Sequence, residues 1–142
     1  MDKVIHFSMP NDVMYGRGCV YSLQYHIVWT TKYRKPILIN NIEADVKRHL
    51  ISVLHSLDMN VMAIEIMPDH VYLLVKCKPQ LRISDAIQQL KGNTARWLFQ
   101  KHPIIKKQLW KGHLWNPSYF VATVSDRSIS QVRTYINNQR IK

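Results

Sequence analysis

The 142 residues suit one domain and leave little room for a separate regulatory module. Twenty Lys and Arg against nine Asp and Glu give a formal net charge of +11 at pH 7, which favours a polyanionic partner such as nucleic acid. No stretch approaches the roughly 20 apolar residues of a membrane span, and the first ten residues do not resemble a signal peptide, so we expect a cytoplasmic protein without membrane contact.

The first predicted element is one long strand over residues 19–30, which are rich in β-branched and aromatic types. It follows an N-terminal extension over residues 1–18 and ends where a basic run leads into Pro36. Cys19 and Cys77 have no Cys or His neighbour at zinc spacing. Both are therefore expected to be small core residues rather than metal ligands.

A helix is predicted next, from its plausible cap Asn41 to about Asp58, because apolar residues recur there at spacings of three and four. Two strand-like runs follow at residues 61–67 and 70–77. Pro68 and Asp69 between them are typical turn residues. The two runs should therefore form an antiparallel hairpin.

A second amphipathic helix is predicted from the apolar residues between Ile83 and Leu98. Ser84 or Asp85 can cap its start, and Pro103 should close it. A basic, Trp-rich connection over residues 103–117 then leads to the last two elements.

The last elements are a short strand over residues 119–124 and a helix over residues 128–142, for which Ser125, Asp126 and Ser128 offer caps. The order β-α-β-β-α-β-α is the split β-α-β pattern of ferredoxin-like folds. We therefore predict a single α+β domain with an RRM-like antiparallel sheet, two helices on one face and an extra C-terminal helix.

Chemistry is suggested first by the strand that begins at His70. Side chains alternate along a strand, and the alternate residues from Val71 to Cys77 are all apolar, so this set should face the helices. His70 and Tyr72 then lie side by side on the open face of the sheet. Asp69 adds a carboxylate at the rim.

The last helix supplies a second pair, because Tyr135 and Gln139 are one turn apart on the same stripe. If this helix covers the open face, Tyr135 lies next to His70. A phenol attacking a phosphodiester needs a cation to neutralise charge, and imidazole nitrogen and amide oxygen are acceptable ligands for Mg²⁺ or Mn²⁺. Taken singly, a strand His and a helix Tyr are more often structural residues.

Five motifs in order extend this pattern over nearly the whole chain. They are Tyr25–Trp29 with Lys32–Arg34, Met67–Val75, Leu90–Gly92, Leu114–Tyr119 and Tyr135–Gln139. Together they resemble the single-tyrosine HUH transposases of the insertion-sequence two-hundred type, which mobilise small elements as single-stranded DNA.

The resemblance implies a homodimer in which the C-terminal helix of one subunit can complete the site of the other. It implies recognition of hairpins at the ends of the element, cleavage that leaves a 5′-phosphotyrosine and a free 3′-hydroxyl, and rejoining by that hydroxyl. On this resemblance Tyr135 is the nucleophile, and His70 and Gln139 hold the Mg²⁺ or Mn²⁺ ion. Two cuts per excision also favour a dimer, because each chain offers one suitable Tyr.

One residue departs from the family pattern: Tyr72 stands where the metal motif has its second His. A neutral phenol is a poor ligand for a hard cation, so Tyr72 is a doubtful metal ligand. His26, Gln24 or a water could substitute, or His26 could be a structural strand residue. Alternatively, Tyr72 disables catalysis and leaves a non-catalytic or domesticated protein that binds hairpins in DNA or RNA.

Basic residues interleaved with aromatic ones suit unpaired or hairpin DNA, because Lys and Arg bind phosphates and aromatic rings stack on bases. The alternative is that some of these Trp side chains are core residues and some Lys only solvated surface. The predicted nucleic-acid-binding residues are Lys32, Tyr33, Arg34, Lys35, Lys91, Arg96, Trp110, Lys111 and Trp115.

Overall fold

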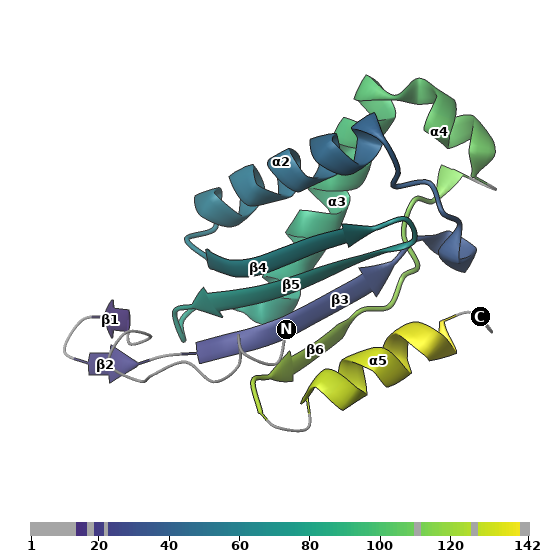
Figure 1. Ribbon diagram of the computed structural model, residues 1–142. Helices are drawn as coiled ribbons and strands as arrows, with labels where there is room; N and C mark the ends of the chain where they lie inside the picture. Colours follow the sequence, from purple (N-terminus) through teal and green to yellow (C-terminus); the bar gives the residue numbers. More distant parts are fainter. Residues whose placement is uncertain (1–13, 17–18, 22, 110–111, 126–127, 140–142) are drawn as a thin grey trace.

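A four-stranded antiparallel sheet forms the centre of the molecule (Figure 1). The computed structural model describes residues 14–16, 19–21, 23–109, 112–125 and 128–139. The strand order is β4-β5-β3-β6. The strands are β3 (Leu23–Thr30), β4 (Asn60–Met67), β5 (His70–Cys77) and β6 (Phe120–Thr123).

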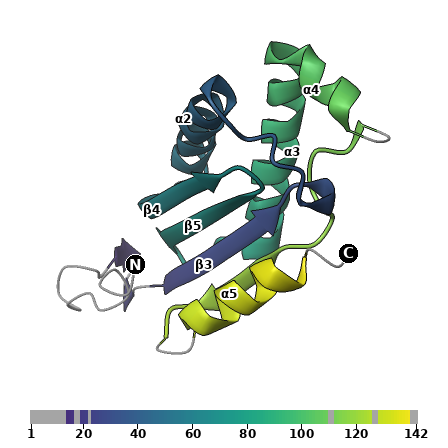
Figure 2. The same ribbon diagram turned by 45° about the vertical axis from the view of Figure 1, so that its right-hand side comes forward.

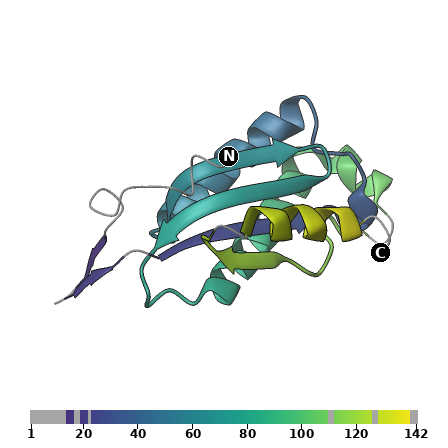
Figure 3. The same cartoon turned by 60° about the horizontal axis from the view of Figure 1, so that its bottom comes forward.

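Helices cover both faces of this sheet. Figures 2 and 3 show α2 and α3 behind the sheet and α5 on the opposite face, along β3 and β6. No helix in the described ranges is long and apolar enough to cross a membrane. The helices are α2 (Asn41–Ser56), α3 (Ile83–Lys101), α4 (Pro103–Gln108), α5 (Ser128–Asn138) and the short 3₁₀ helix η2 (Lys32–Arg34).

This arrangement confirms the predicted ferredoxin-like α+β fold. The β4–β5 hairpin turns at Pro68–Asp69 as expected, with Met67 paired with His70. The second half of the fold, α3 followed by β6, returns the chain to the far side of β3. Two helices therefore lie on one face, and the extra C-terminal helix lies on the other.

The predicted long strand over residues 19–30 is wrong in one respect, because it is two strands. β2 (Cys19–Tyr21) pairs with β1 (Met14–Gly16) in a separate two-stranded sheet. Only β3 belongs to the main sheet, where it pairs with β5 from Leu23 opposite Cys77 to Thr30 opposite His70. β5 begins and ends at those two partners, so no part of β5 remains for β2 to pair with.

The caps predicted for the first two helices are also wrong. Asn41 is the first residue of α2, after the cap position Asn40, and α3 starts at Ile83, so Ser84 and Asp85 lie inside its first turn. Neither cap position has a side-chain cap hydrogen bond. The spacing of apolar residues predicted where both helices lie. It did not predict the first residue of each helix, because the conformation of the preceding loop determines that residue.

Pro103 follows the end of α3, as predicted, but it also begins α4. Proline suits the first turn of a helix because its missing N–H has no partner there anyway. The predicted connection over residues 103–117 therefore contains a short helix.

The sheet separates two hydrophobic cores. The predicted inward set of β5, from Val71 to Cys77, lies in the larger core with α2 and α3. On the other face Tyr72 and Leu74 pack with Val28 of β3 and Val132 of α5. The face of the sheet that was predicted to be open is thus covered by α5, the helix that carries Tyr135.

An acidic residue joins the ends of α2 and α3. The Asp45 carboxylate accepts hydrogen bonds from His102 Nε2 at 2.7 Å and from Arg48, and Lys101 Nζ lies 3.3 Å away. The His102 bond is the main cause that lowers the pKa of Asp45 to about 2, and the Arg48 and Lys101 contacts add to it, against a burial that raises it. Asp45 is therefore ionised well below neutral pH.

We expect the free energy of unfolding to fall as the pH is lowered from about 4 to about 2, because Asp carboxyls in the unfolded chain titrate near 3.9. The Asp45 contribution is fully present above that value and is lost as the pH passes through the folded-state pKa. Urea unfolding of wild type and Asp45→Asn should show a shallower decline in the variant. An equal decline would contradict this role of Asp45.

Candidate active site

The imidazole of His70 is oriented by the residue before it. His70 Nδ1 lies 2.8 Å from Asp69 Oδ1, and the His70 side chain is 15% exposed. Burial alone would raise the pKa of Asp69, but hydrogen bonds from His70 and Arg34 hold it below its ordinary value. An ionised Asp69 accepts a hydrogen bond from the Nδ1–H of His70, which leaves the lone pair of His70 Nε2 available to a ligand.

Arg34 joins this pair to the C-terminal helix. Its Nε and Nη2 lie 2.8 and 2.6 Å from Asp69 Oδ2, and its Nη1 donates to the carbonyl of Ile136 at 2.9 Å. The guanidinium is only 10% exposed. Arg34 was predicted to bind nucleic acid, and in the structure its three nitrogens have protein partners.

Tyr135 lies on α5 with its ring beside Phe120 of β6, at a centroid distance of 5.6 Å. Its hydroxyl is 2.9 Å from Ser118 Oγ. Burial raises the pKa of the Tyr135 phenol, and the hydrogen bond with Ser118 acts in the opposite direction. The phenol is therefore protonated at neutral pH and held by one hydroxyl partner.

Gln139 follows the last turn of α5 and is 2% exposed. Its backbone N–H donates to the carbonyls of Tyr135 and Ile136, so the turn continues to this residue. Its side-chain Oε1 is buried and has no hydrogen-bond partner within the described ranges. Burying an amide oxygen without a hydrogen bond lowers stability by about 1–3 kcal/mol. Gln139 Oε1 is therefore a candidate to accept a hydrogen bond from a ligand or to bind a cation.

Thr30 also lies at this end of the sheet, although it was not among the residues predicted from the sequence. It pairs directly with His70, and directly paired residues on neighbouring strands point to the same face. Its Oγ1 is buried without a partner in the described part of the chain. The β3–β5 register was the signal that could have identified Thr30, and that register is a tertiary property.

The predicted pair on α5 is connected to the predicted His70 indirectly. A continuous series of contacts runs from His70 through Asp69 and Arg34 to the Ile136 carbonyl, between Tyr135 and Gln139. The structure records no direct hydrogen bond from His70 to either residue of that pair. The start of β5 and the end of α5 are thus joined through Asp69 and Arg34 rather than through His70, Tyr135 or Gln139 themselves.

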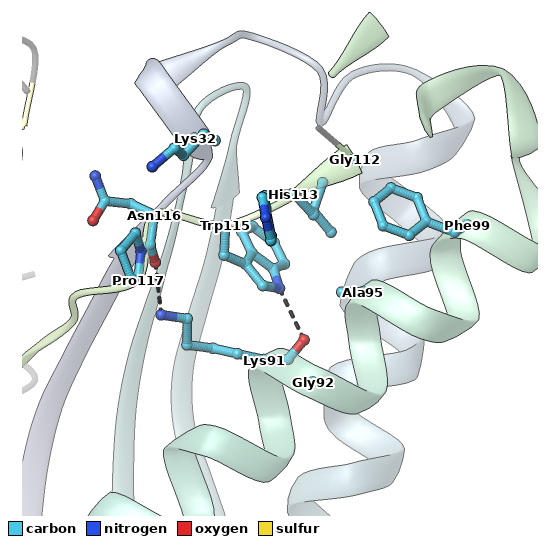
Figure 4. A pocket seen from close by; sticks show the side chains of 11 residues that line it. Lys32, Lys91, Gly92, Ala95, Phe99, Gly112, His113, Trp115, Asn116 and Pro117 are labelled. Carbon is cyan, nitrogen blue, oxygen red and sulfur yellow. Dashed lines mark hydrogen bonds between the residues drawn. The ribbon is translucent and has the colours of Figure 1, made fainter. Parts of the chain in front are cut away.

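Three of the predicted nucleic-acid-binding residues, Lys32, Lys91 and Trp115, line a cavity of about 390 Å³ between α3 and residues 112–117 (Figure 4). Lys91 Nζ donates to the carbonyls of Asn116 and Ser118 at 2.8 and 3.0 Å, and burial lowers its pKa to about 8. Trp115 donates its Nε1–H to the Lys91 carbonyl at 2.9 Å. Lys91 therefore supports the loop that positions Ser118.

The remaining residues of this group differ in exposure. Tyr33 is 50% exposed with Lys32 Nζ 5.0 Å from its ring centroid, whereas Trp115 is 8% exposed and belongs to the larger core. Lys35 Nζ donates to the Gln108 carbonyl, and Arg96 Nη2 donates to Asn93 Oδ1. Trp110 and Lys111 lie outside the described residues.

Comparison with known proteins identifies the family. The model of the family described as "Transposase IS200 like" matches residues 19–139. The chain belongs to the IS200-like transposases. It is 40% identical over 134 residues to the ISDra2 transposase TnpA of Deinococcus radiodurans, covering 94% of this chain and 96% of that protein. The transposase for insertion sequence element IS200 of Salmonella typhimurium is 24% identical over 84% of this chain and 78% of its own length.

Two solved structures resemble this transposase. A transposase from Deinococcus radiodurans R1 superposes with a TM-score of 0.84 at 42% identity, covering 89% of this chain and 97% of that one. A REP-associated tyrosine transposase bound to a REP hairpin has a TM-score of 0.55 at 15% identity, over 87% and 71% of the two chains. The second likeness shows a shared fold.

Tyr72 of this transposase has a structural partner. Its hydroxyl lies 2.6 Å from His26 Nδ1, and both side chains are almost fully buried. Burial, with a smaller effect of Glu65, raises the pKa of Tyr72, and burial lowers the pKa of His26. Both groups are therefore neutral. This bond favours the structural interpretation of His26 and leaves the Tyr72 hydroxyl engaged.

Gln24, the other side chain that could replace the expected second His as a ligand, does not lie at this end of the sheet. Gln24 pairs with Lys76 at the end of β3 farthest from the Thr30–His70 pair. In the described ranges, no group of three or more His, Cys, Asp and Glu side chains could hold a metal ion.

We expect Tyr72→Phe to lower the free energy of unfolding by about 1–3 kcal/mol, because His26 Nδ1 would stay buried without its partner. Urea denaturation measures the change. Tyr25→Phe, at a position of β3 that packs against the larger core, is the matched control and should change stability less. Equal stability of Tyr72→Phe and wild type would contradict a structural role for this hydroxyl.

Proposed function

We propose that this transposase cleaves and rejoins single-stranded DNA at hairpin-bearing ends through a covalent bond between Tyr135 and a 5′-phosphate. The observation that carries the proposal is the buried Oε1 of Gln139, which has no partner among the described residues. Gln139 directly follows the helix that carries Tyr135, and Arg34 joins that helix to the Asp69–His70 pair.

The chemistry follows from the groups at hand. Tyr135 Oη attacks phosphorus, the Tyr–O–P bond forms, and the bond from phosphorus to the 3′-oxygen breaks. The phenol gives up its proton and the leaving 3′-oxygen takes one up, so a free 3′-hydroxyl results. A 3′-hydroxyl attacking the phosphotyrosine reverses these changes and rejoins the strand.

Two of the three predicted metal ligands, His70 and Gln139, suit a divalent cation. His70 Nε2, with Nδ1 held by Asp69, and Gln139 Oε1 would hold Mg²⁺ or Mn²⁺, and Mg²⁺ is commonly bound by few protein ligands together with phosphates and waters. The cation would neutralise charge on the phosphate. Tyr72 does not fit, because it is buried and bonded to His26.

The DNA partner and the assembly are part of the same proposal. The solved relative bound to a REP hairpin supports a hairpin as the ligand, and the net charge of +11 supports a polyanion. A homodimer would supply the two tyrosines that two cuts require, with Tyr135 acting in its own subunit or across the dimer. A cytoplasmic location, where DNA is accessible, stays a prediction.

A second candidate function is hairpin binding without catalysis. The observation that favours it is the engagement of Tyr72 with His26 where the family motif has a metal-binding His. A protein of this kind would keep the basic and aromatic surface and lack cleavage. The two candidates differ in whether a covalent adduct forms.

We expect wild type, incubated with Mn²⁺ and single-stranded DNA carrying the end hairpin of the element, to form a covalent protein–DNA adduct on a denaturing gel. Tyr135→Phe should abolish the adduct, because a phenyl ring has no nucleophile. Tyr25→Phe, which alters a tyrosine packed against the larger core, is the control and should retain it. Hairpin binding by wild type without any adduct would favour the non-catalytic candidate.

We expect Tyr72→His to raise the Mn²⁺-dependent cleavage rate by roughly tenfold or more, because an imidazole restores a ligand that a neutral phenol cannot replace. Single-turnover cleavage at several Mn²⁺ concentrations measures this gain. Tyr72→Phe, which adds no ligand, should show no increase. An unchanged rate in Tyr72→His would mean that the phenol does not limit the reaction.

A further inference from the structure

The guanidinium of Arg34 uses both of its edges. One edge, Nε and Nη2, faces Asp69 Oδ2, and Nη1 on the other side donates to the Ile136 carbonyl. These partners are 35 and 102 residues away in the chain. A single planar cation thus links the turn before β5 to the last turn of α5.

The backbone around Arg34 is held in an unusual conformation. Tyr33 and Arg34 have φ angles of 56° and 53°, which lie in the left-handed region that residues other than glycine rarely adopt. The strand end is tied to the same turn, because Thr31 N–H donates to the Asp69 carbonyl at 2.9 Å and Arg34 N–H donates to the Thr31 carbonyl at 2.9 Å. Tertiary contacts therefore maintain a local geometry that aims Arg34 at Asp69.

We propose that Arg34 is a positioning residue for the reaction, which rests on the function proposed above. Its contact with Asp69 fixes the carboxylate that orients His70, so that His70 Nε2 stays available to a ligand. Its contact with the Ile136 carbonyl fixes the end of α5 and with it the position of Gln139. Arg34 acts through these residues and does not touch the reacting atoms. The same engagement makes it a poor phosphate contact, since the guanidinium is 10% exposed.

Lysine cannot take this role. Its ammonium is a point charge, whereas the rigid guanidinium presents donors in two directions at once. Arg34→Lys therefore keeps the charge and loses one of the two connections. This variant separates the geometry of the contact from its charge.

The first test is hydrogen exchange along α5 in full-length protein. We expect Arg34→Gln to speed exchange in residues 128–139 by roughly ten- to hundredfold, with Arg34→Lys intermediate and exchange in α2 and α3 unchanged. Arg133→Gln removes an equal charge from an exposed site on α5 and should match wild type. Unchanged exchange of α5 in Arg34→Gln would overturn the proposal, and so would faster exchange throughout the chain.

The second test separates positioning from DNA contact. The slope of log affinity for hairpin DNA against log salt should be the same for Arg34→Gln and Arg133→Gln. The Mn²⁺ concentration for half-maximal cleavage should rise about tenfold or more in Arg34→Gln alone. A salt slope reduced by about one in Arg34→Gln alone, or an unchanged Mn²⁺ requirement, would overturn the proposal.

These readouts also distinguish this proposal from the proposed function. Absence of cleavage by wild type would refute catalysis, whereas hydrogen exchange and the salt slope need no cleavage. Cleavage by wild type, together with unaltered α5 exchange in Arg34→Gln, would refute only the role of Arg34.

Discussion

The sheet of this transposase has two apolar faces, and the need to cover the second one shapes the candidate site. Val28, Tyr72 and Leu74 would be exposed to water if α5 did not pack Val132 against them. Burying apolar surface contributes about 25 cal/mol per Å², so this packing stabilises a helix that would be marginal alone. Figure 2 shows α5 along β3 and β6, and Arg34 joins the Ile136 carbonyl of its last turn to Asp69, just before β5.

The polar atoms at that end fall into two groups. The first is paired: Asp69 holds His70 and Arg34, and Arg34 holds the Ile136 carbonyl. The second group is Thr30 Oγ1 and Gln139 Oε1, which have no hydrogen-bond partner in the part of the chain that the structure describes. Paired groups fix geometry, whereas unpaired buried acceptors cost stability, and sites of function are where proteins tolerate such a cost.

Tyr72 shows how packing and coordination compete for one position. A phenol fills the second core and bonds to His26 in a low-dielectric environment, where a neutral pair is favourable. An imidazole at the same position would offer a cation ligand but less apolar surface. Tyr72 thus adds structural contacts at a position where an imidazole would serve the proposed cation site.

Local periodicity was sufficient for much of this protein. The alternating apolar residues of β5, the Pro68–Asp69 turn and the stripe of the last helix predicted the sheet, the hairpin and which face carries His70 and Tyr72. Periodicity cannot name a long-range partner, because it reports only which side of an element a residue occupies. The Tyr72–His26 bond spans 46 residues and the Arg34–Ile136 bond spans 102, so only the tertiary structure decided them.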